Sequence, residues 1–416
     1  MSDRSEPSSP PLAWLDIPKA TLAALAAGGL LCCAGRAYPQ ESRKKIRLGV
    51  VGGGFGAGFW WHEHPNCVVT AVTDLYPARR KRLQERYRCD AVYDSLEIML
   101  KEAKDIDAVA VFSGAPDHPK HAKMCFERGL HVVSAVPACM TLEEAAMLKQ
   151  LKEKTGLRYM MAESSYYRQE CIFARNLFQA GGFGELFYSE TEYYHDGGDP
   201  DKTTSNIGSL VYNPDGTRSW RWGFPPMLYP THCTGFLTGV TRERIVKVSC
   251  LGWQSQQPKL KNHPLRTENV YKNPFWNQAA LMLTDQGHMS RCNVLWRCVA
   301  GGERAQWFGD KATFYMANGP VNPNILGTPG EKASPAPVPQ YWKSDMLPEP
   351  MRHDSGHGGS AAFISAEFIN ALLEDREPAI DLYESLAMTV PGIVAHESSF
   401  KDGEQLPVPQ FDPHKA

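Results

Sequence analysis

Apolar positions in the first part of the chain occur in short runs that are separated by segments of helical periodicity. The runs are rich in β-branched residues, as is typical of parallel strands that are buried on both faces. They occupy residues 46–51, 67–74, 105–113, 130–136 and 158–164. Helical patterns fill intervals between them, at residues 78–87, 119–129 and 141–156. Strands that alternate with helices at this spacing predict a doubly wound α/β sheet.

After Gly184, polar and apolar residues alternate with period two. This pattern is typical of an antiparallel sheet with one face in water. It occurs in residues 185–195, 244–254, 277–286, 288–300, 303–310 and 311–317. Residues 318–358 are rich in Pro and Gly and are predicted to form a long irregular loop, and residues 360–378 return to a helical pattern.

The first 44 residues contain one apolar run, residues 20–34, which is followed by Gly35-Arg36-Ala37. The run is too short to span a bilayer but suits the apolar core of a signal peptide cleaved after Ala37. A disordered tail or a stray amphipathic helix is the alternative. A signal peptide in residues 1–37 would make the protein periplasmic or exported, and without one we expect a cytoplasmic protein. No stable membrane span is expected in either case.

Composition narrows the choice of partners. A chain of 416 residues favours two domains. The net charge of −2, without a basic cluster interleaved with aromatics, predicts no nucleic-acid partner. Eleven cysteines occur without a C-x-x-C pair, which favours free thiols over a zinc or disulfide framework. His118 and His121 lie one helical turn apart without a third ligand at suitable spacing, so no metal site is predicted.

A glycine-rich turn follows the first predicted strand. It is formed by Gly52, Gly53, Gly54, Phe55, Gly56 and Ala57, and it is expected to open a helix. Small residues let the backbone approach a pyrophosphate, and a helix N-terminus offers free N–H donors. Asp74, at the end of the next predicted strand, would bind a ribose hydroxyl and repel a 2′-phosphate. The motif therefore predicts an NAD site, with NADP disfavoured but kept open by Arg79 and Arg80; a purely structural turn is the alternative.

The block "VFSGAPDHPKHAKMCFERGLHVVSAVP", residues 111–137, resembles the Gfo/Idh/MocA oxidoreductases. The family's pattern is matched at His118, Gly129, His131, Val132 and Pro137. It is not matched at Gly114, where the family has proline, at Leu130, where it has lysine, or at Ala135-Val136, where it has Glu-Lys. The resemblance runs from about residue 45 to the C-terminus. It implies that Ser113, His118, Val136 and Pro137 lie at the cofactor.

This resemblance implies an α/β fold with an N-terminal Rossmann dinucleotide-binding domain, residues 45–163. An α+β domain with a large open, mostly antiparallel sheet, residues 164–416, would follow it and bind the substrate. A second block, "PPMLYPTHCTGFLTGVT", contains His232. Dehydrogenases of the family place an acid four residues before this histidine, and the position is Leu228 here. Both the family lysine and this acid are therefore missing, while the histidine remains.

Five short motifs are together similar to glycoside hydrolase family 109. They are Tyr-Pro-Thr-His at 229–232, Val-Pro at 136–137, "MMAES" with Glu163, "YYHD" at 193–196 and "HGG" at 357–359. Members of that group retain NAD and hydrolyse N-acetylgalactosaminides. The resemblance implies that Tyr229 and His232 are an acid/base pair and that Glu163 contacts the nicotinamide or the sugar. It also implies that the sugar pocket contains His195, Tyr193, Trp220 and Arg221.

The match departs from the group at Cys233-Thr234-Gly235-Phe236 and at Ala361, which leaves the sugar open. We expect an NAD-dependent oxidoreductase that transfers a hydride at a ring hydroxyl of a sugar or glycoside. Retained NAD with elimination and hydration would give net hydrolysis. The alternatives are an ordinary NAD(P)-dependent sugar or polyol dehydrogenase and a non-catalytic nucleotide-binding relative. The exposed sheet face would allow a homo-oligomer.

Overall fold

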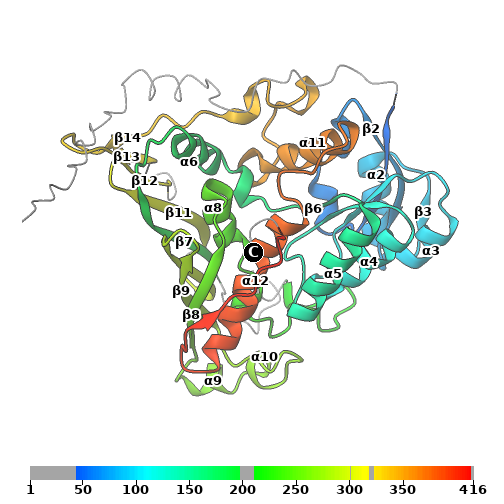
Figure 1. The fold of residues 1–416 in the computed structure, drawn as a ribbon. Coiled ribbons are helices and arrows are strands. Elements are labelled where there is room, and N and C mark those ends of the chain that lie inside the picture. The colour runs from blue at the N-terminus through cyan, green and yellow to red at the C-terminus, as the bar shows by residue number, and fades with distance from the viewer. Residues whose placement is uncertain (1–43, 197–209, 300, 318–322, 414–416) are drawn as a thin grey trace, which may run out of the picture.

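The computed structural model describes residues 44–196, 210–299, 301–317 and 323–413 (Figure 1). The signal peptide predicted in residues 1–37 lies outside the described residues. None of the helices in the described part of the chain combines the length and the apolarity needed to cross a membrane.

The first sheet has six parallel strands in the order β3-β2-β1-β4-β5-β6, which confirms the predicted α/β fold. The strands are β1 (Ile46–Val51), β2 (Cys67–Thr73), β3 (Val92–Tyr93), β4 (Ala108–Val111), β5 (His131–Ser134) and β6 (Tyr159–Met161). The helices between them are α2 (Pro77–Tyr87), α3 (Leu96–Glu102), α4 (His118–Glu127) and α5 (Leu142–Thr155). Every residue of β4 and β6 is buried, because helices cover both faces of the sheet.

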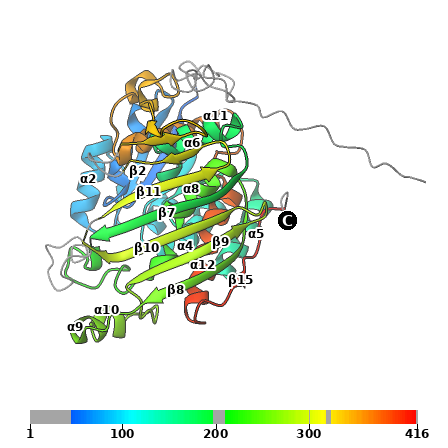
Figure 2. The ribbon, with the colours of Figure 1, turned by 90° about the vertical axis from the view of Figure 1, so that its left-hand side faces the viewer.

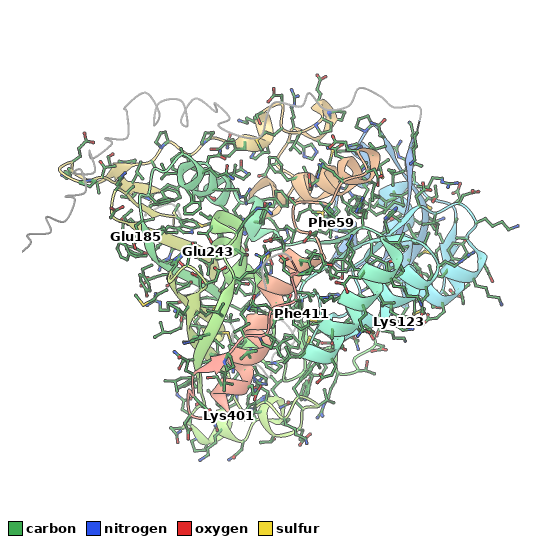
Figure 3. All side chains as sticks on the ribbon, viewed as in Figure 1. Phe59, Lys123, Glu185, Glu243, Lys401 and Phe411 are labelled. Atoms are coloured by element: carbon green, nitrogen blue, oxygen red, sulfur yellow. The ribbon has the colours of Figure 1, made fainter. Side chains whose placement is uncertain are left out.

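The prediction of a helix directly after the glycine-rich turn is wrong. Two short 3-10 helices, Gly56–Gly58 and Trp61–Glu63, stand there instead. Phe59 and Trp61 are both buried, and their rings stack with centroids 5.7 Å apart. Residues two positions apart do not share a face of an α-helix, so burying both of them requires a different backbone. Figure 3 shows Phe59 among the interior side chains, whereas Lys123 and Lys401 lie on the outer surface.

The second sheet has nine strands in the order β14-β13-β12-β11-β7-β10-β9-β8-β15. Its longer strands are β7 (Leu186–Asp196), β8 (Ile245–Trp253), β9 (Asn277–Thr284), β10 (Met289–Cys298) and β11 (Gly302–Gly309). The shorter ones are β12 (Thr313–Tyr315), β13 (Ile325–Gly327), β14 (Ser334–Pro335) and β15 (Leu406–Pro407). Neighbours are antiparallel except β7 and β10, so the predicted mostly antiparallel sheet is confirmed. The segment predicted as an irregular loop contributes β13 and β14 to one edge.

One face of this sheet carries helices and the other is open. Figure 2 shows the open face, with α8 (Thr231–Thr241) and α12 (Leu382–Ser399) behind the strands. Among the described residues, the other α-helices outside the first sheet are α6 (Gln169–Gln179), α9 (Pro258–Lys261), α10 (Pro264–Thr267) and α11 (Ser360–Leu373). On the open face, Arg291 Nη2 lies 2.9 Å from Glu190 Oε2 and 3.2 Å from Glu192 Oε1. Leu251 and Leu281 are also exposed there, and self-association through this face stays a prediction.

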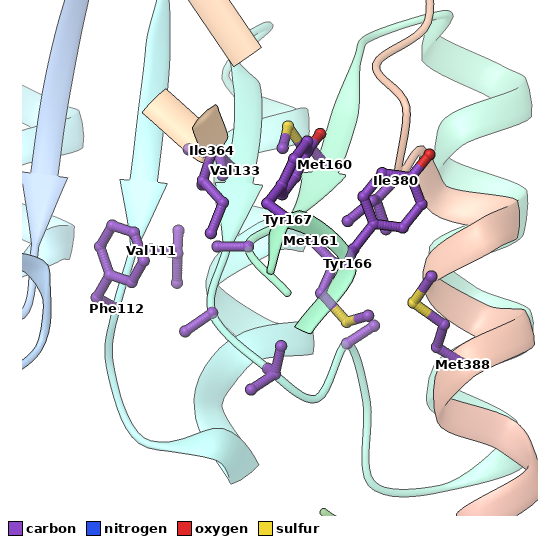
Figure 4. Close-up of a cluster of buried hydrophobic side chains, with 14 of the residues drawn as sticks. Val111, Phe112, Val133, Met160, Met161, Tyr166, Tyr167, Ile364, Ile380 and Met388 are labelled. Atoms are coloured by element: carbon purple, nitrogen blue, oxygen red, sulfur yellow. The ribbon is translucent and has the colours of Figure 1, made fainter. Parts of the chain in front are cut away.

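The C-terminal helices pack on both domains. The amide of Met161 in β6 donates to the carbonyl oxygen of Ile380, at 3.1 Å. Lys152 of α5 pairs with Glu377 at 2.6 Å, and the amide of Trp60 donates to Ser365 Oγ of α11 at 3.2 Å. Figure 4 shows Met388 of α12 in the same apolar cluster as Met161 and Tyr166. Residues 360–399 therefore join the two domains into one body.

Candidate active site

The glycine-rich turn has the geometry that a dinucleotide requires. Gly52 has φ +95°, and a Cβ atom there would lie 2.1 Å from the carbonyl oxygen of Phe112. A Cβ on Gly53 would lie 2.3 Å from the carbonyl oxygen of Arg79. A Cβ on Gly54 would have no atom closer than 3.7 Å, so the backbone is open on that side. The first two glycines are required by packing, and the third leaves room for a pyrophosphate.

Asp74 closes this turn. Its Oδ2 accepts a hydrogen bond from the Gly53 amide at 2.7 Å, and its Oδ1 accepts one from the Tyr76 amide at 2.8 Å. Each carboxylate oxygen can accept a second hydrogen bond, which a ribose hydroxyl would donate. Arg80 donates to the carbonyl oxygen of Asp74 at 2.8 Å and pairs with Asp94 at 3.0 Å, so its charge is already engaged. These residues fit NAD.

His118 is a buried residue that contacts two backbone carbonyl groups near the glycine-rich turn. Its Nδ1 lies 2.8 Å from the carbonyl oxygen of Pro137, and its Nε2 lies 3.1 Å from that of Ser113. Burial lowers the pKa of His118, and a neutral ring donates to one carbonyl at a time. Because the ring is enclosed, we assign it to holding the ends of β4 and β5 together. Val136 is buried and has no titratable group.

The chemical centre is a buried carboxylate–imidazole pair. Glu163 follows β6, and His232 lies in the first turn of α8; Glu163 Oε1 is 2.7 Å from His232 Nδ1. The same Oε1 accepts a hydrogen bond from the Ser165 amide at 2.8 Å. A Cβ on Gly235 would lie 3.0 Å from Glu163 Cγ, so this glycine gives the carboxylate its room. One partner comes from each domain, and Nε2 is the imidazole nitrogen left to face a ligand.

Three residues that sequence reasoning missed surround this pair. Glu303 of β11 is held by Arg168 through hydrogen bonds of 2.9 and 3.0 Å. The Ser165 hydroxyl donates to Glu303 at 2.9 Å and lies 3.4 Å from His232 Nδ1. Burial would raise the pKa of Glu303, but Arg168 and the other donors hold it at about 2. Only the fold brings Glu303 here, since it stands far along the chain from Glu163.

The charges of this group favour an imidazolium. Burial lowers the pKa of His232, but the charge and hydrogen bond of Glu163, together with Glu303, outweigh it and raise the pKa above its ordinary value. Burial likewise raises the pKa of Glu163, and the charge and hydrogen bond of His232 bring it below its ordinary value. Both directions describe one ion pair between a carboxylate and a protonated ring.

Aromatic rings pack around the imidazole. The ring centroids of Tyr193 and Tyr229 lie 4.4 and 5.3 Å from that of His232. The Tyr193 hydroxyl is 2.8 Å from His195 Nε2. Burial lowers the pKa of His195 to about 4, so its ring is neutral at pH 7. Leu228 is a buried apolar residue beside Tyr229 and offers no acid.

Trp220 and Arg221 reach this group from the loop that precedes Tyr229. The Arg221 guanidinium carbon lies 4.2 Å from the Trp220 ring centroid and 5.1 Å from that of Tyr229. Trp220 also packs on Gly114 at the end of β4, where a Cβ would lie 2.6 Å from its Cδ1. The glycine that replaces the family's proline therefore makes room for a tryptophan from the other domain.

Gly114→Ala is expected to weaken the binding of a ligand that contacts Trp220 or Arg221 by about tenfold, because overpacking costs about 1–3 kcal/mol and displaces both side chains. The backbone at Gly114 has φ −69° and ψ 146°, which alanine adopts freely, so only the contact changes. Titration of the NAD-loaded protein with sugars measures the effect. Gly327→Ala, where the nearest atom would be 3.7 Å away, is the control. Equal affinity in both variants would contradict this role of Trp220.

The predicted site residues lie in two groups. The glycine-rich turn and Asp74 lie on the first sheet, while Glu163, His232, Tyr229, Tyr193 and His195 form the chemical centre. Next to this centre an open recess reaches from His195 and Arg221 to Arg266. Among the described residues, no group of three or more His, Cys, Asp or Glu side chains could hold a metal ion.

Comparison with known proteins agrees with this fold. Residues 46–163 match the family model of the Gfo/Idh/MocA oxidoreductases, described as "Oxidoreductase family, NAD-binding Rossmann fold". By this match and by its fold, residues 46–163 are an NAD-binding Rossmann domain. The resemblance predicted from residues 111–137 is confirmed.

Proteins named glycosyl hydrolase family 109 protein are similar over most of the chain. The one from Solibacter usitatus is 25% identical over 407 residues, with 88% of each chain covered. The one from Streptomyces filamentosus is 25% identical over 90% of this chain and 78% of its own. The motif similarity to this group is thus confirmed at the level of sequence.

Solved structures share the fold of both domains. Scyllo-inositol dehydrogenase from Lactobacillus casei with bound NAD(H) and scyllo-inositol has a TM-score of 0.66 at 16% identity, covering 88% of this chain and 99% of its own. Levoglucosan dehydrogenase in complex with NADH and levoglucosan has a TM-score of 0.69 at 15% identity, covering 88% and 100%.

Proposed function

We propose that this protein is an NAD-dependent oxidoreductase that acts on a glycoside, retains its NAD and achieves net hydrolysis of the glycosidic bond. The observation that carries the proposal is the Glu163–His232 ion pair beside Tyr229. The positions where dehydrogenases of the family have their lysine and acid are Val136 and Leu228, which are buried and apolar. The names of the curated relatives give independent support.

The chain's own residues supply binding and proton transfer. The glycine-rich turn and Asp74 would hold NAD, and the bound cofactor would supply a hydride acceptor, so that the oxidised sugar has an acidic C–H beside its carbonyl. Tyr229 and His232 are placed to take and return protons at that sugar. His232 holds its transferable proton at Nε2, since Nδ1 faces Glu163. Glu303 and Arg168 fix Ser165 and thereby the orientation of the pair.

The second candidate is an ordinary sugar dehydrogenase. It is supported by the solved structures of sugar and polyol dehydrogenases, which share this fold. Both routes need a base to accept the hydroxyl proton as hydride leaves, and the hydrolytic route also needs an acid that protonates the departing aglycone. The raised pKa of His232 favours the protonated ring, which can be that acid. A proton donor suits the departure of an aglycone, which is why the hydrolytic route is preferred here.

The test begins with the purified chain, its absorbance spectrum and the nucleotide released on denaturation. The native protein is then incubated with a panel of aryl glycosides without added cofactor. Tightly held NAD and release of the aglycone are expected. Loosely held NAD, no release and growth of NADH with a free sugar would instead identify a dehydrogenase in which His232 acts without the family's lysine.

Glu163→Gln should move the alkaline limit of activity to lower pH. The carboxylate raises the pKa of His232, so without it burial dominates and the ring loses its proton earlier. Profiles of kcat/KM between about pH 5 and 9 measure this shift. Glu127→Gln, an exposed residue paired with Lys123 on α4, is the control. An unchanged alkaline limit would show that Glu163 does not set the charge of His232.

The same pair makes stability depend on pH. The raised pKa of His232 stabilises the fold fully below its ordinary value of 6.5, and this contribution is lost as the pH rises through the folded-state pKa. The lowered pKa of Glu163 stabilises above its ordinary value of 4.5, and this contribution is lost as the pH falls through the folded-state pKa. The destabilisation caused by Glu163→Gln is therefore expected to be largest between these two values.

A further inference from the structure

The recess beside the chemical centre contains positive charge without a matching acid. Its described lining consists of His195, Leu210, Val211, Arg221, Phe224, Leu265, Arg266, Trp276 and Trp296. Two of these residues are arginines and none is an aspartate or glutamate. The remaining walls are apolar or aromatic, as in many small-molecule sites.

Arg266 is the least satisfied of the charged groups in this recess. It lies on α10 and is only 9% exposed. Its guanidinium carbon is 4.5 Å from the Trp276 ring centroid, and Nη1 donates to the carbonyl oxygen of Phe275. Nε is buried without an acceptor among the described residues. Burial lowers the pKa of Arg266 to about 9, and no carboxylate opposes this effect.

Arg221 stands at the other end of the recess, toward the chemical centre. It stacks on Trp220 and Tyr229 and makes no side-chain hydrogen bond or ion pair with a described residue. The nearby Glu268 is already engaged with Arg218 at 2.8 Å. Buried guanidinium groups are ordinarily paired, because the desolvation cost of an unpaired one is not offset by any attraction. A ligand with a negative charge would offset this cost.

We infer that the recess holds a negatively charged substituent of the substrate, a carboxylate or a sulfate-type group, with Arg266 as its main contact and Arg221 as the second. A planar guanidinium donates two parallel hydrogen bonds to such groups, whereas a neutral hydroxyl uses only one. The aromatic walls suit the apolar face of a sugar ring. This inference rests on the proposed function, since it places the anion on the same sugar that lies beside Tyr229 and His232.

Isothermal titration of the NAD-loaded, full-length protein tests the charge preference. The probes are D-glucuronate and D-galacturonate for a carboxylate, glucose 6-sulfate for a sulfate, and glucose and galactose as neutral parents. At least one anionic probe is expected to bind about 10- to 100-fold more tightly than its parent. The arm that shows the preference identifies the group. Equal binding of every anionic probe and its parent would overturn the inference.

Three variants locate the contact. Arg266→Met should reduce the preference to about twofold or less, and Arg266→Lys should keep part of it because the charge remains. Arg218→Met, on an exposed arginine that stacks on Trp222, should keep the full preference. A purely structural Arg266 predicts the reverse for the methionine variant, namely a lower Tm with an unchanged preference. If that variant does not fold, the wild-type titrations alone decide.

These outcomes are separable from the test of hydrolysis. If the protein prefers anionic sugars but releases no aglycone, the anion site is supported and the hydrolytic function is contradicted. If the protein releases aglycones from neutral glycosides and shows no charge preference in titration, the hydrolytic function is supported and the anion site is contradicted.

Discussion

Replacing His232 with alanine should lower kcat by about 10²- to 10⁴-fold while NAD stays bound. The imidazole is the titratable group held between the two domains, with Nδ1 fixed by Glu163 and Nε2 left for the substrate. Removal of the ring also leaves the Glu163 carboxylate, which is 0% exposed, without its counter-ion. We therefore expect the free energy of unfolding to fall by about 3–5 kcal/mol as well.

His232→Ala needs two readouts, because lost stability and lost chemistry must be distinguished. NAD content after purification and Tm report on the fold, and single-turnover rates report on the chemistry. His62→Gln, at an exposed position of the second 3-10 helix, is the control and should change neither. A folded, NAD-loaded alanine variant that keeps the wild-type rate would exclude His232 from proton transfer and favour a binding protein.

Gly52→Ala is expected to abolish binding of NAD and to destabilise the fold by about 2 kcal/mol or more. The added Cβ would lie 2.1 Å from the carbonyl oxygen of Phe112, and the backbone φ of +95° is strained for alanine. The clashing atom is backbone, so a rotamer change cannot relieve it. The turn must move away from β4, and the amide of Gly53 then loses Asp74.

Gly58→Ala is the matched control for Gly52→Ala. It lies six residues further along, and nothing is within 4 Å of its added Cβ. The nucleotide released on denaturation and the thermal unfolding curve of both variants give the comparison. Retained NAD in Gly52→Ala would mean that the turn holds its shape for reasons other than this contact.

The two sheets were predictable because their patterns are set by burial. Strands such as β4, buried on both faces, appear as continuous apolar runs, and strands such as β10, wet on one face, alternate. The prediction of a helix after the glycine-rich turn was wrong because tertiary packing, and not local sequence, sets the backbone there. Phe59 and Trp61 both enter the core, and local sequence does not show that two aromatic residues at this spacing share one cluster.

The candidate site was only partly predictable. Motifs pointed to His232 and Tyr229, and the structure brings Glu163 to them from the end of β6. Glu303 could not be found in this way, because its place opposite Tyr193 depends on the register between β7 and β11. Arg266 stands on a four-residue helix with no periodic signal, and only burial without an acid partner distinguishes it.

The packing of residues 360–399 on both domains has a consequence for how the protein is made. The edge strand of the first sheet, β6, obtains an acceptor from Ile380, and Trp60 obtains one from Ser365. The first domain is therefore synthesised well before residues 360–399, which cover its edge. Until those residues are made, it has an unpaired strand edge and exposed apolar side chains, and both favour aggregation of the growing chain.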